Sequence, residues 1–220
     1  MRRTTLSVAL AALLLAAPAP LALADGHKAS EQTVTGGKIK DLSTKPADVV
    51  AGTYKLDPTH VNVTWIVSHL GLSPYQGRFN DISGEMTIDP AKPAEASVAI
   101  TIKTDSVDTL SDRLDEELKS DEGFNAAEYP EITFKSTKVE VMDGGQAKVT
   151  GDLTMLGKTK PVTLDVTLVG TGPHPFAKKQ AVGFKATARF NRSEFGFTQW
   201  APVIGDTVDL VIGAEFQKAD

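Results

Sequence analysis

Apolar and polar residues alternate along most of the chain after Gly52, so that nearly every second position carries an aliphatic or aromatic side chain. A period of two is typical of β-strands that have one buried and one exposed face. The clearest alternating runs cover residues 61–67, 98–102, 162–168, 182–190 and 208–216. Weaker runs cover residues 54–56, 78–88, 131–141 and 147–155. The pattern therefore predicts a chain made mainly of β-strands.

One of the weaker runs changes parity in its middle. Phe79 is odd-numbered, whereas Ile82, Met86 and Ile88 are even-numbered. All four side chains can share one face of a strand only if an extra residue is inserted between them. We therefore predict a β-bulge near Asn80–Asp81.

A single stretch departs clearly from the alternation. Leu110, Leu114 and Leu118 recur every four residues among charged neighbours, which predicts a short amphipathic helix over residues 110–119. Thr109 and Asp112 have the spacing of a capping box at the start of this helix. We expect the three leucines to lie across one end of the sheet.

Short turns separate several of the predicted strands. Asp143-Gly144-Gly145 and Leu156-Gly157-Lys158 each join two alternating runs, which favours antiparallel neighbours. Antiparallel strands with one apolar face bury it either by closing into a barrel or by stacking two sheets. Strands of roughly 8 to 10 residues suit a barrel of about eight strands, the size that holds one small ligand. We predict an all-β fold, an extended antiparallel barrel of about eight strands with one or two short helices.

The first 24 residues have the layout of a secretory signal peptide. Arg2 and Arg3 precede an apolar stretch over residues 6–17, and small residues occupy the end at Ala24. We expect cleavage after Ala24 and export to the periplasm. Residues 25–51 are polar and lack apolar periodicity, which predicts a flexible leader. A barrel domain is then expected over residues 52–220.

Composition and charge remove several classes of function. The chain has 28 acidic and 23 basic residues, a formal net charge of −5, and no cluster of Lys and Arg, so we do not expect nucleic acid as a partner. The absence of cysteine excludes disulfides, thiolate catalysis and cysteine-based metal sites. After the signal, no apolar stretch approaches the roughly 20 residues that a membrane-spanning helix needs, so we expect no stable membrane insertion.

Three residues raise the question of catalysis or metal binding. Asp57, His60 and His69 are close in sequence, but an odd spacing directs His60 and His69 to opposite faces of a regular strand. The sequence around Asp57 and His60 is better interpreted as a turn that enters a strand. Nucleophile motifs and phosphate-binding loops are absent from the chain. We therefore expect neither an enzyme nor a metal site, with a lipid-modifying enzyme that uses His60 or His69 and Asp57 as the second hypothesis.

The expected new terminus would have its own metal chemistry. Cleavage after Ala24 exposes Asp25-Gly26-His27, whose amino nitrogen, amides and imidazole suit copper(II) or nickel(II). Histidine at the third position is common, however, so chance explains this tripeptide better.

Aromatic and aliphatic residues on the predicted inward faces provide the stronger functional signal. Core packing explains any one of them alone, whereas together they would line an elongated apolar pocket. The predicted ligand-binding residues are Val63, Trp65, Val67, Phe79, Ile100, Phe134, Leu153, Leu164, Val166, Phe184, Phe190, Phe197 and Trp200. The predicted polar rim consists of His60, His69 and Arg189.

Eight short segments occur in an order that is typical of one known family. They are Tyr54–His60, Ser68–Gly71, Gly77–Phe79, Leu118–Phe124, Tyr129–Ser136, Gly151–Val162, Asn191–Gly196 and Gly205–Val208. In these segments the chain resembles the YceI-like polyisoprenoid-binding family, and the resemblance extends in order from residue 52 to residue 217. It implies a lipocalin-like extended barrel that is exported, is often a homodimer, holds an isoprenoid chain or quinone-like amphiphile, and has no established catalysis.

The resemblance and the alternating apolar face lead to one principal expectation. We expect a periplasmic protein that binds, stores or transports a polyisoprenoid or isoprenoid-quinone-like lipid inside an apolar barrel, with that lipid as ligand and no other cofactor. Burying apolar surface gains about 25 cal/mol per Å², so a tube of aliphatic and aromatic side chains can hold such a tail with few polar contacts. A secreted stress-response module, whose outer face would bind another protein, is the third hypothesis.

Overall fold

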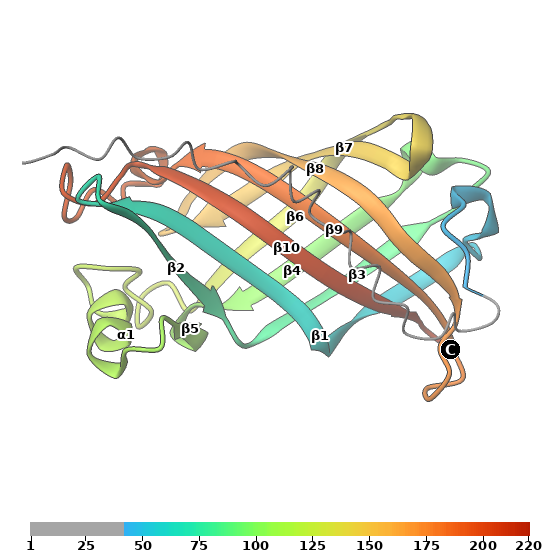
Figure 1. Ribbon diagram of the computed structural model, residues 1–220, viewed down its shortest axis with the longest axis horizontal. Helices are drawn as coiled ribbons and strands as arrows, with labels where there is room; N and C mark the ends of the chain where they lie inside the picture. The colour runs from blue at the N-terminus through green and yellow to red at the C-terminus, as the bar shows by residue number, and fades with distance from the viewer. Residues whose placement is uncertain (1–41) are drawn as a thin grey trace, which may run out of the picture. The chain divides into compact units, whose positions relative to one another are not determined.

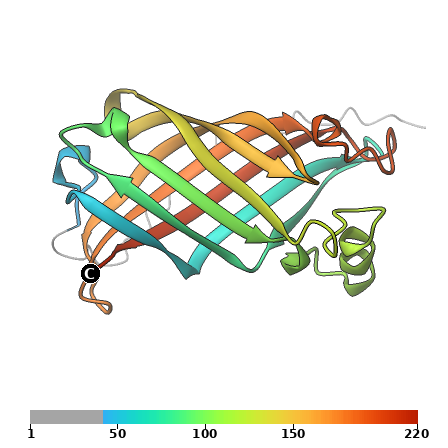
Figure 2. The same cartoon turned by 180° about the vertical axis from the view of Figure 1, so that it is seen from behind.

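The chain forms a closed β-barrel in the computed structural model, which describes residues 42–220 (Figures 1 and 2). The predicted signal peptide and the first part of the predicted leader, including Asp25-Gly26-His27, lie outside the described residues. The strands are β1 (Gly52–His69), β2 (Ser73–Phe79), β3 (Ile82–Ile88), β4 (Ser97–Lys103), β5 (Val107–Asp108), β6 (Glu131–Val141), β7 (Gln146–Met155), β8 (Lys158–Pro173), β9 (Gln180–Asn191) and β10 (Thr207–Lys218). The helical segments are α1 (Asp112–Lys119) and the 3₁₀ segments η1 (Pro46–Asp48), η2 (Pro93–Glu95), η3 (Thr104–Ser106), η4 (Asp143–Gly145) and η5 (Arg192–Phe195).

Eight strands close the barrel. They follow the order β1-β3-β4-β6-β7-β8-β9-β10, and β10 pairs back with β1 to complete the ring. Each of these pairings is antiparallel. β2 and β5 extend one end of the barrel, where β2 pairs with the second half of β1 and β5 pairs with β2. The predicted eight-stranded antiparallel barrel is therefore confirmed.

The parity change between Phe79 and Ile82 corresponds to the break between β2 and β3. Both strands pair with β1, and Asn80–Asp81 form the interruption between them. Phe79, Ile82 and Met86 are all buried on the inner face, so the change of parity is confirmed, but it occurs at a break between β2 and β3 and not at a bulge within one strand.

β1 contains an irregularity of its own. Its pairing with β10 stops after Leu56 and resumes at Val61, so the intervening residues 57–60 bulge out of the ladder. The sequence suggested a turn before a strand, but the segment interrupts a strand that continues on both sides. On its other side, β1 changes partner from β3 to β2 across the same region.

The predicted turns between strands form tight connections. Leu156 and Gly157 join β7 to β8 with φ values of 51° and 68°, which fits the two-residue hairpin turns that need positive φ. The predicted turn at residues 143–145 is η4, which joins the antiparallel strands β6 and β7. Both hairpin predictions are confirmed.

The α-helix begins later than the leucine spacing predicted. Leu110 precedes α1, has a φ of 64° and is 90% exposed, whereas Leu114 and Leu118 do pack toward the barrel. Thr109 forms no capping box with Asp112. Instead, the Asp115 carboxylate accepts hydrogen bonds from the Thr109 backbone N–H at 2.8 Å and from its hydroxyl at 2.6 Å. The predicted helix start and cap were wrong, because spacing alone cannot show that the chain turns sharply at Leu110.

Residues 42–51 belong to the barrel domain, although the sequence predicted a flexible leader through residue 51. Ser43 and Thr171 of β8 exchange two backbone hydrogen bonds of 2.8 Å. Val49 is only 4% exposed, and the Tyr54 hydroxyl donates a 2.6 Å hydrogen bond to the Val50 carbonyl. A few buried groups are sufficient to order this segment, even though it lacks apolar periodicity.

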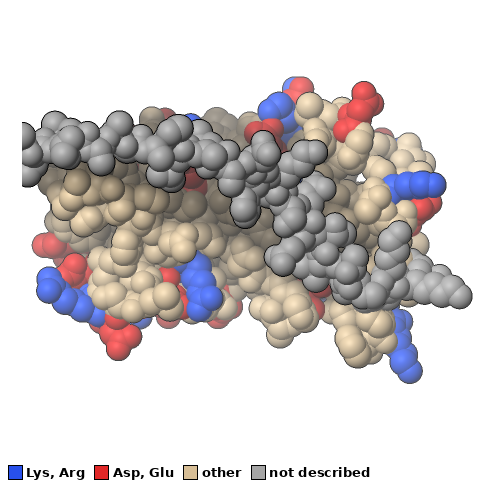
Figure 3. Space-filling view, viewed as in Figure 1, with Lys and Arg blue, Asp and Glu red and all other residues tan. Residues whose placement is uncertain are grey.

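The barrel has two distinct ends. One end carries α1, β5 and the β9–β10 connection, and the other carries η1 and the C-terminus (Figure 1). We call them the α1 end and the η1 end. Charged side chains of both signs gather around α1 and around the opposite end (Figure 3). Within the described part of the chain, none of the helices combines the length and the apolar character that crossing a bilayer requires.

Candidate functional site

The barrel interior contains two apolar cavities arranged end to end. Cavity 1 has a volume of about 270 Å³ and extends toward the η1 end, where Pro46 contributes to its wall. Cavity 2 has a volume of about 470 Å³ and extends toward the α1 end, where Leu114 and Leu118 contribute. Pockets that hold small molecules typically measure roughly 300 to 1,000 Å³, so the interior is large enough for a ligand.

Four aliphatic side chains line both cavities. They come from four different strands: Val63 of β1, Ile102 of β4, Leu153 of β7 and Leu210 of β10. We call this set the waist. Because the cavities share these residues, they are adjacent chambers of the barrel interior, divided at the waist.

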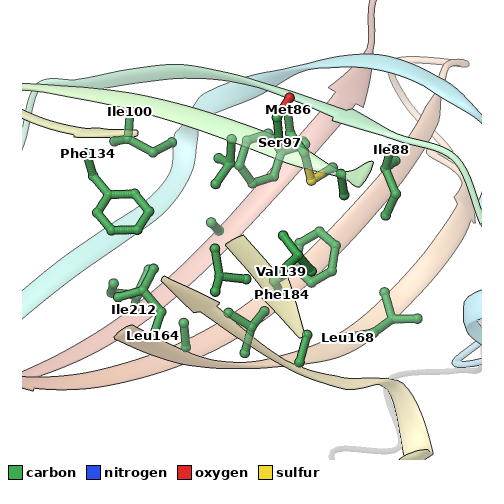
Figure 4. A pocket seen from close by; sticks show the side chains of 18 of the residues that line it. Met86, Ile88, Ser97, Ile100, Phe134, Val139, Leu164, Leu168, Phe184 and Ile212 are labelled. Carbon is green, nitrogen blue, oxygen red and sulfur yellow. The ribbon is translucent and has the colours of Figure 1, made fainter. Parts of the chain in front are cut away.

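The wall of cavity 1 is almost entirely hydrocarbon. Figure 4 shows side chains of β3, β4, β6, β8, β9 and β10 turned toward a common space. Its labelled apolar residues are Met86, Ile88, Ile100, Phe134, Val139, Leu164, Leu168, Phe184 and Ile212. Among the described residues that line this cavity, Ser97 and Gln146 carry the polar side chains, and both lie at the start of a strand. Cavity 1 can therefore accommodate a hydrocarbon chain but offers few partners for a polar group.

Cavity 2 combines aromatic rings with several polar groups. Phe124 packs against Phe79 and Phe197 with ring-centroid distances of 5.6 and 5.0 Å, and Trp200 lies 6.0 Å from Phe197. The polar and charged residues in its wall are His69, Tyr75, Glu117 and Arg192. The indole N–H of Trp65 is buried and has no hydrogen-bond partner among the described residues. Cavity 2 therefore offers a polar ligand group several partners, which cavity 1 does not.

Inward-facing glycines make room for two of the large rings. Gly77 pairs with Trp65 across β1 and β2, and a Cβ atom at Gly77 would overlap the indole. A Cβ atom at Gly151 of β7 would likewise overlap the Phe134 ring on β6, although Gly151 pairs with Ser136. The absence of a side chain at these positions allows each ring to lie flat over the neighbouring strand.

Arg192 organises the connection between β9 and β10 at the α1 end. Its guanidinium donates hydrogen bonds of 2.8 to 3.0 Å to the backbone carbonyls of Phe197, Gln199, Ile204 and Gly205. The side chain is almost completely buried, and this burial lowers the pKa of Arg192. One buried cation thus holds the loop that carries Trp200 over cavity 2.

All thirteen predicted ligand-binding residues line one of the two cavities. Val63 and Leu153 line both. The residues in cavity 1 are Ile100, Phe134, Leu164, Val166 and Phe184. The residues in cavity 2 are Trp65, Val67, Phe79, Phe190, Phe197 and Trp200. Their contact with a bound lipid stays a prediction.

The three predicted rim residues lie in different places. His69 lines cavity 2. Arg189 is on the outer face of β9, where its Nε donates to the Asp209 carboxylate at 2.6 Å, and His60 is also on the outer face. His60 and Arg189 line neither cavity, because the bulge in β1 and the strand parity direct them outward.

Asp57 and His60 form a hydrogen-bonded cluster on the outside of the barrel. One Asp57 carboxylate oxygen accepts from the Thr59 N–H and hydroxyl, and the other lies 2.9 Å from His60 Nδ1. Burial opposes ionisation of Asp57, but hydrogen bonds from His60 and Thr59 outweigh it and hold the pKa of this carboxyl well below its usual range. The hydrogen bond to Asp57 and the charge of Asp57 raise the pKa of His60.

Glu215 completes this outer cluster, with its carboxylate, Asp57 and His60 offering potential metal-ligand atoms within 4.8 Å of one another. Both oxygens of Asp57 are already used in hydrogen bonds. The hydrogen bonds of Asp57 therefore stabilise the bulge in β1. His69 lies elsewhere, in the wall of cavity 2, so the structure brings Asp57 together with His60 on the outer face but not with His69.

Sequence reasoning missed several residues of the site. Ile102 and Leu210 were on predicted inward faces but were not selected, although parity alone would have found them. Glu117, Phe124 and Arg192 reach cavity 2 from a helix and from loops, for which alternation provides no signal.

Most of the chain matches a known family of proteins. The YceI-like domain aligns with residues 54–216 of the chain. The chain belongs to the YceI-like family. Protein YceI of Escherichia coli O6:H1 is 37% identical over 187 residues, which cover 84% of this chain and 97% of that protein.

Solved structures of relatives have the same fold. BcnA of Burkholderia cenocepacia superimposes with a TM-score of 0.66 at 27% identity, covering 73% of this chain and 98% of that one. The YceI protein of Campylobacter jejuni gives a TM-score of 0.63 at 32% identity, covering 70% and 90%. A polyisoprenoid-binding domain from Saccharophagus degradans gives 0.55 at 18% identity, covering 77% and 100%, and supports the fold alone.

Proposed function

We propose that this YceI-like protein binds a polyisoprenoid or isoprenoid-quinone-like lipid inside its barrel and stores or transports it in the periplasm without catalysis. The two adjacent, largely apolar cavities inside the barrel are the observation that carries this proposal. Its wall offers hydrocarbon on all sides, which suits a ligand whose tail is almost insoluble in water. Every Å² of that tail removed from water contributes about 25 cal/mol, so the tail itself supplies the affinity.

The different walls of the two chambers favour one orientation of the ligand. A headgroup that carries oxygen atoms would lie in cavity 2, near Trp65, His69 and Arg192, because buried polar groups need hydrogen-bond partners. The isoprenoid tail would then pass the waist into cavity 1.

Two further observations support the location and the ligand class. The N-terminal 24 residues have the charge and apolar pattern of a secretory signal, which supports a periplasmic protein. A relative of the same fold is described as a polyisoprenoid-binding domain. A homodimer, as the family resemblance implies, stays a prediction that light scattering tests.

The position of the outer cluster favours binding over catalysis. Asp57 and His60 are hydrogen-bonded to each other on the outer face, and neither lines a cavity that could hold a lipid. A general base must lie within hydrogen-bond reach of its substrate, which this pair does not do.

Mass spectrometry of bound lipid tests the proposal directly. The protein is purified from bacterial periplasm without detergent, extracted with organic solvent, and compared with a variant in which Leu210→Phe and Val63→Phe fill the waist. We expect an isoprenoid lipid in the parent extract and much less in the variant. Val211→Phe is the matched control, because Val211 is adjacent to Leu210 but faces outward and is 46% exposed. A parent protein that yields no lipid, while periplasmic lipid is recovered from the same preparation, would refute the proposal.

A further inference from the structure

Exposed apolar side chains gather where cavity 2 reaches the surface. Val203 lines cavity 2 and is also 50% exposed, so the cavity opens at the α1 end. Nearby, Leu70 is 52% exposed, Leu72 is 82% exposed and Leu110 is 90% exposed. We call these four residues the apolar mouth.

Three separate segments of the chain form the apolar mouth. The β1–β2 turn carries Leu70 and Leu72, and the Leu70 N–H donates a 2.8 Å hydrogen bond to the carbonyl of Val203 in the β9–β10 connection. The segment before α1 carries Leu110, and the hydroxyl of Tyr75 on β2 reaches the neighbouring carbonyl of Thr109 at 3.4 Å. All three segments lie at the same end of the barrel in Figure 1.

Two of these exposed leucines also have an unfavourable backbone conformation. Leu70 and Leu110 have φ values of 56° and 64°, in the left-handed region that favours glycine or asparagine. Leucine in such a position is disfavoured by its backbone, and the described residues cover only about half of Leu70 and almost nothing of Leu110, so burial compensates little. A side chain with neither advantage is best explained by a partner outside the chain, and apolar patches of this kind mark interaction sites.

The chemistry around the mouth indicates what that partner is. The mouth surrounds the opening of a cavity that, under the proposed function, takes up a lipid with almost no solubility in water. The neighbouring segment, residues 112–122, contains six acidic and two basic residues, which would repel an anionic surface. A bilayer surface with little negative charge satisfies both conditions.

We propose that the apolar mouth docks on the surface of a lipid bilayer with little net negative charge, so that the ligand passes between bilayer and cavity 2 without crossing water. This inference rests on the proposed function and adds to it the surface through which the lipid enters and leaves cavity 2. Leucine side chains inserted at the interface provide the binding, as in other proteins that lie on a membrane surface.

Vesicle binding tests the docking itself. The double variant Leu72→Asp and Leu110→Asp is compared with the parent by flotation with phosphatidylcholine vesicles, and we expect its affinity to fall roughly tenfold or more. Phe176→Asp is the matched control, because Phe176 is 88% exposed in the β8–β9 loop near the η1 end. Parent binding should weaken when phosphatidylglycerol is added to the vesicles at low salt. A parent that does not float, or a control that loses as much binding as the double variant, would overturn the inference.

A loading experiment separates failure of the docking from failure of the proposed function. Parent and double variant are incubated with a polyprenol delivered from detergent micelles and analysed by mass spectrometry. We expect equal loading, together with slower uptake by the double variant when the same polyprenol is delivered in vesicles. Equal uptake from vesicles would contradict the docking, whereas a parent that takes up no polyprenol from micelles would contradict the proposed function. A parent dimer that the double variant dissociates, with no vesicle binding, would assign the mouth to an interface between two copies and also overturn the inference.

Discussion

Gln217, near the end of the last strand, donates a 2.8 Å hydrogen bond from its side-chain amide to the carboxylate of Asp57 in the first strand. Asp57 lies in the β1 bulge, at the seam where β10 pairs back with β1 and the barrel closes. The same carboxylate accepts hydrogen bonds from Thr59 and His60. Asp57 therefore accepts hydrogen bonds from both strands and stabilises the irregular part of this seam.

The low pKa of Asp57 predicts a specific dependence of stability on pH. Its folded-state pKa lies below the unfolded value of about 3.9, so its stabilisation is present above that value and is lost as the pH falls through the folded pKa. Asp57→Asn should lower the free energy of unfolding by about 1 to 3 kcal/mol at pH 6, and by less at pH 3. Urea unfolding at both pH values measures the difference. Asp165→Asn is the control, because the Lys148–Asp165 pair is exposed and should contribute little to stability.

The stabilisation that His60 provides should depend on pH in the opposite direction. Its hydrogen bond to Asp57 raises its pKa, so its stabilisation is complete below the unfolded value of about 6.5 and disappears as the pH rises through the folded pKa. We expect His60→Gln to destabilise the protein at pH 5 and to have no effect at pH 9. Urea unfolding curves decide the question, and an effect that is equal at both pH values would show that His60 contributes by packing instead of by charge.

The waist should control the length of the bound lipid. Leu153→Phe places a ring where the two cavities meet, so long tails should be confined to one chamber. When the protein is loaded from a mixture of prenols of increasing length, the bound fraction should shift toward shorter chains in mass spectra. Leu153→Met is the control, because it nearly conserves volume, whereas the phenylalanine should also cost about 1 to 3 kcal/mol of stability through overpacking. An unchanged length distribution would mean that the ligand does not pass the waist.

Strand parity predicted most of the cavity wall because a barrel interior repeats with the period of the strand. Val63, Trp65 and Val67 alternate on β1, and each lines a cavity in the structure. The same periodicity located the break between Phe79 and Ile82. Where backbone pairing is regular, the inward face follows directly from residue number.

The parts that sequence did not predict depend on irregular backbone. His60 was assigned to the rim, but the bulge at residues 57–60 places it on the outer face. Leu110 was assigned to a helix, but its left-handed backbone removes it from α1 and exposes it at the mouth. Arg192 had no recognisable role, because its partners are backbone carbonyls of a loop. Such contacts follow from the path of the chain and leave no periodic signal.

Arg192 should be required for the order of the β9–β10 connection. Lysine keeps the charge but cannot reproduce the planar guanidinium that bonds four carbonyls, so Arg192→Lys should cost about 2 to 4 kcal/mol. Hydrogen exchange should accelerate in residues 196–206. Arg189→Lys is the matched control, because among the described residues Arg189 of β9 forms a single exposed pair, with Asp209 of β10. Equal protection of the loop in both variants would contradict this role.

The tryptophans should report which chamber holds the headgroup. The chain contains two tryptophans, Trp65 and Trp200, and both line cavity 2. If the polar end of a quinone-type lipid lies there, its ring should quench both indoles, so Trp65→Phe and Trp200→Phe should each retain a quenchable signal. A polyprenol of equal length lacks a quinone ring and should bind with little quenching, which makes it the control ligand. If mass spectrometry detects bound quinone but tryptophan emission does not change, the quinone ring lies in cavity 1. The indole N–H of Trp65, which has no hydrogen-bond partner within residues 42–220, and the polar wall of cavity 2 argue for the first outcome, because a quinone oxygen in cavity 1 would lose the hydrogen bonds it makes in water.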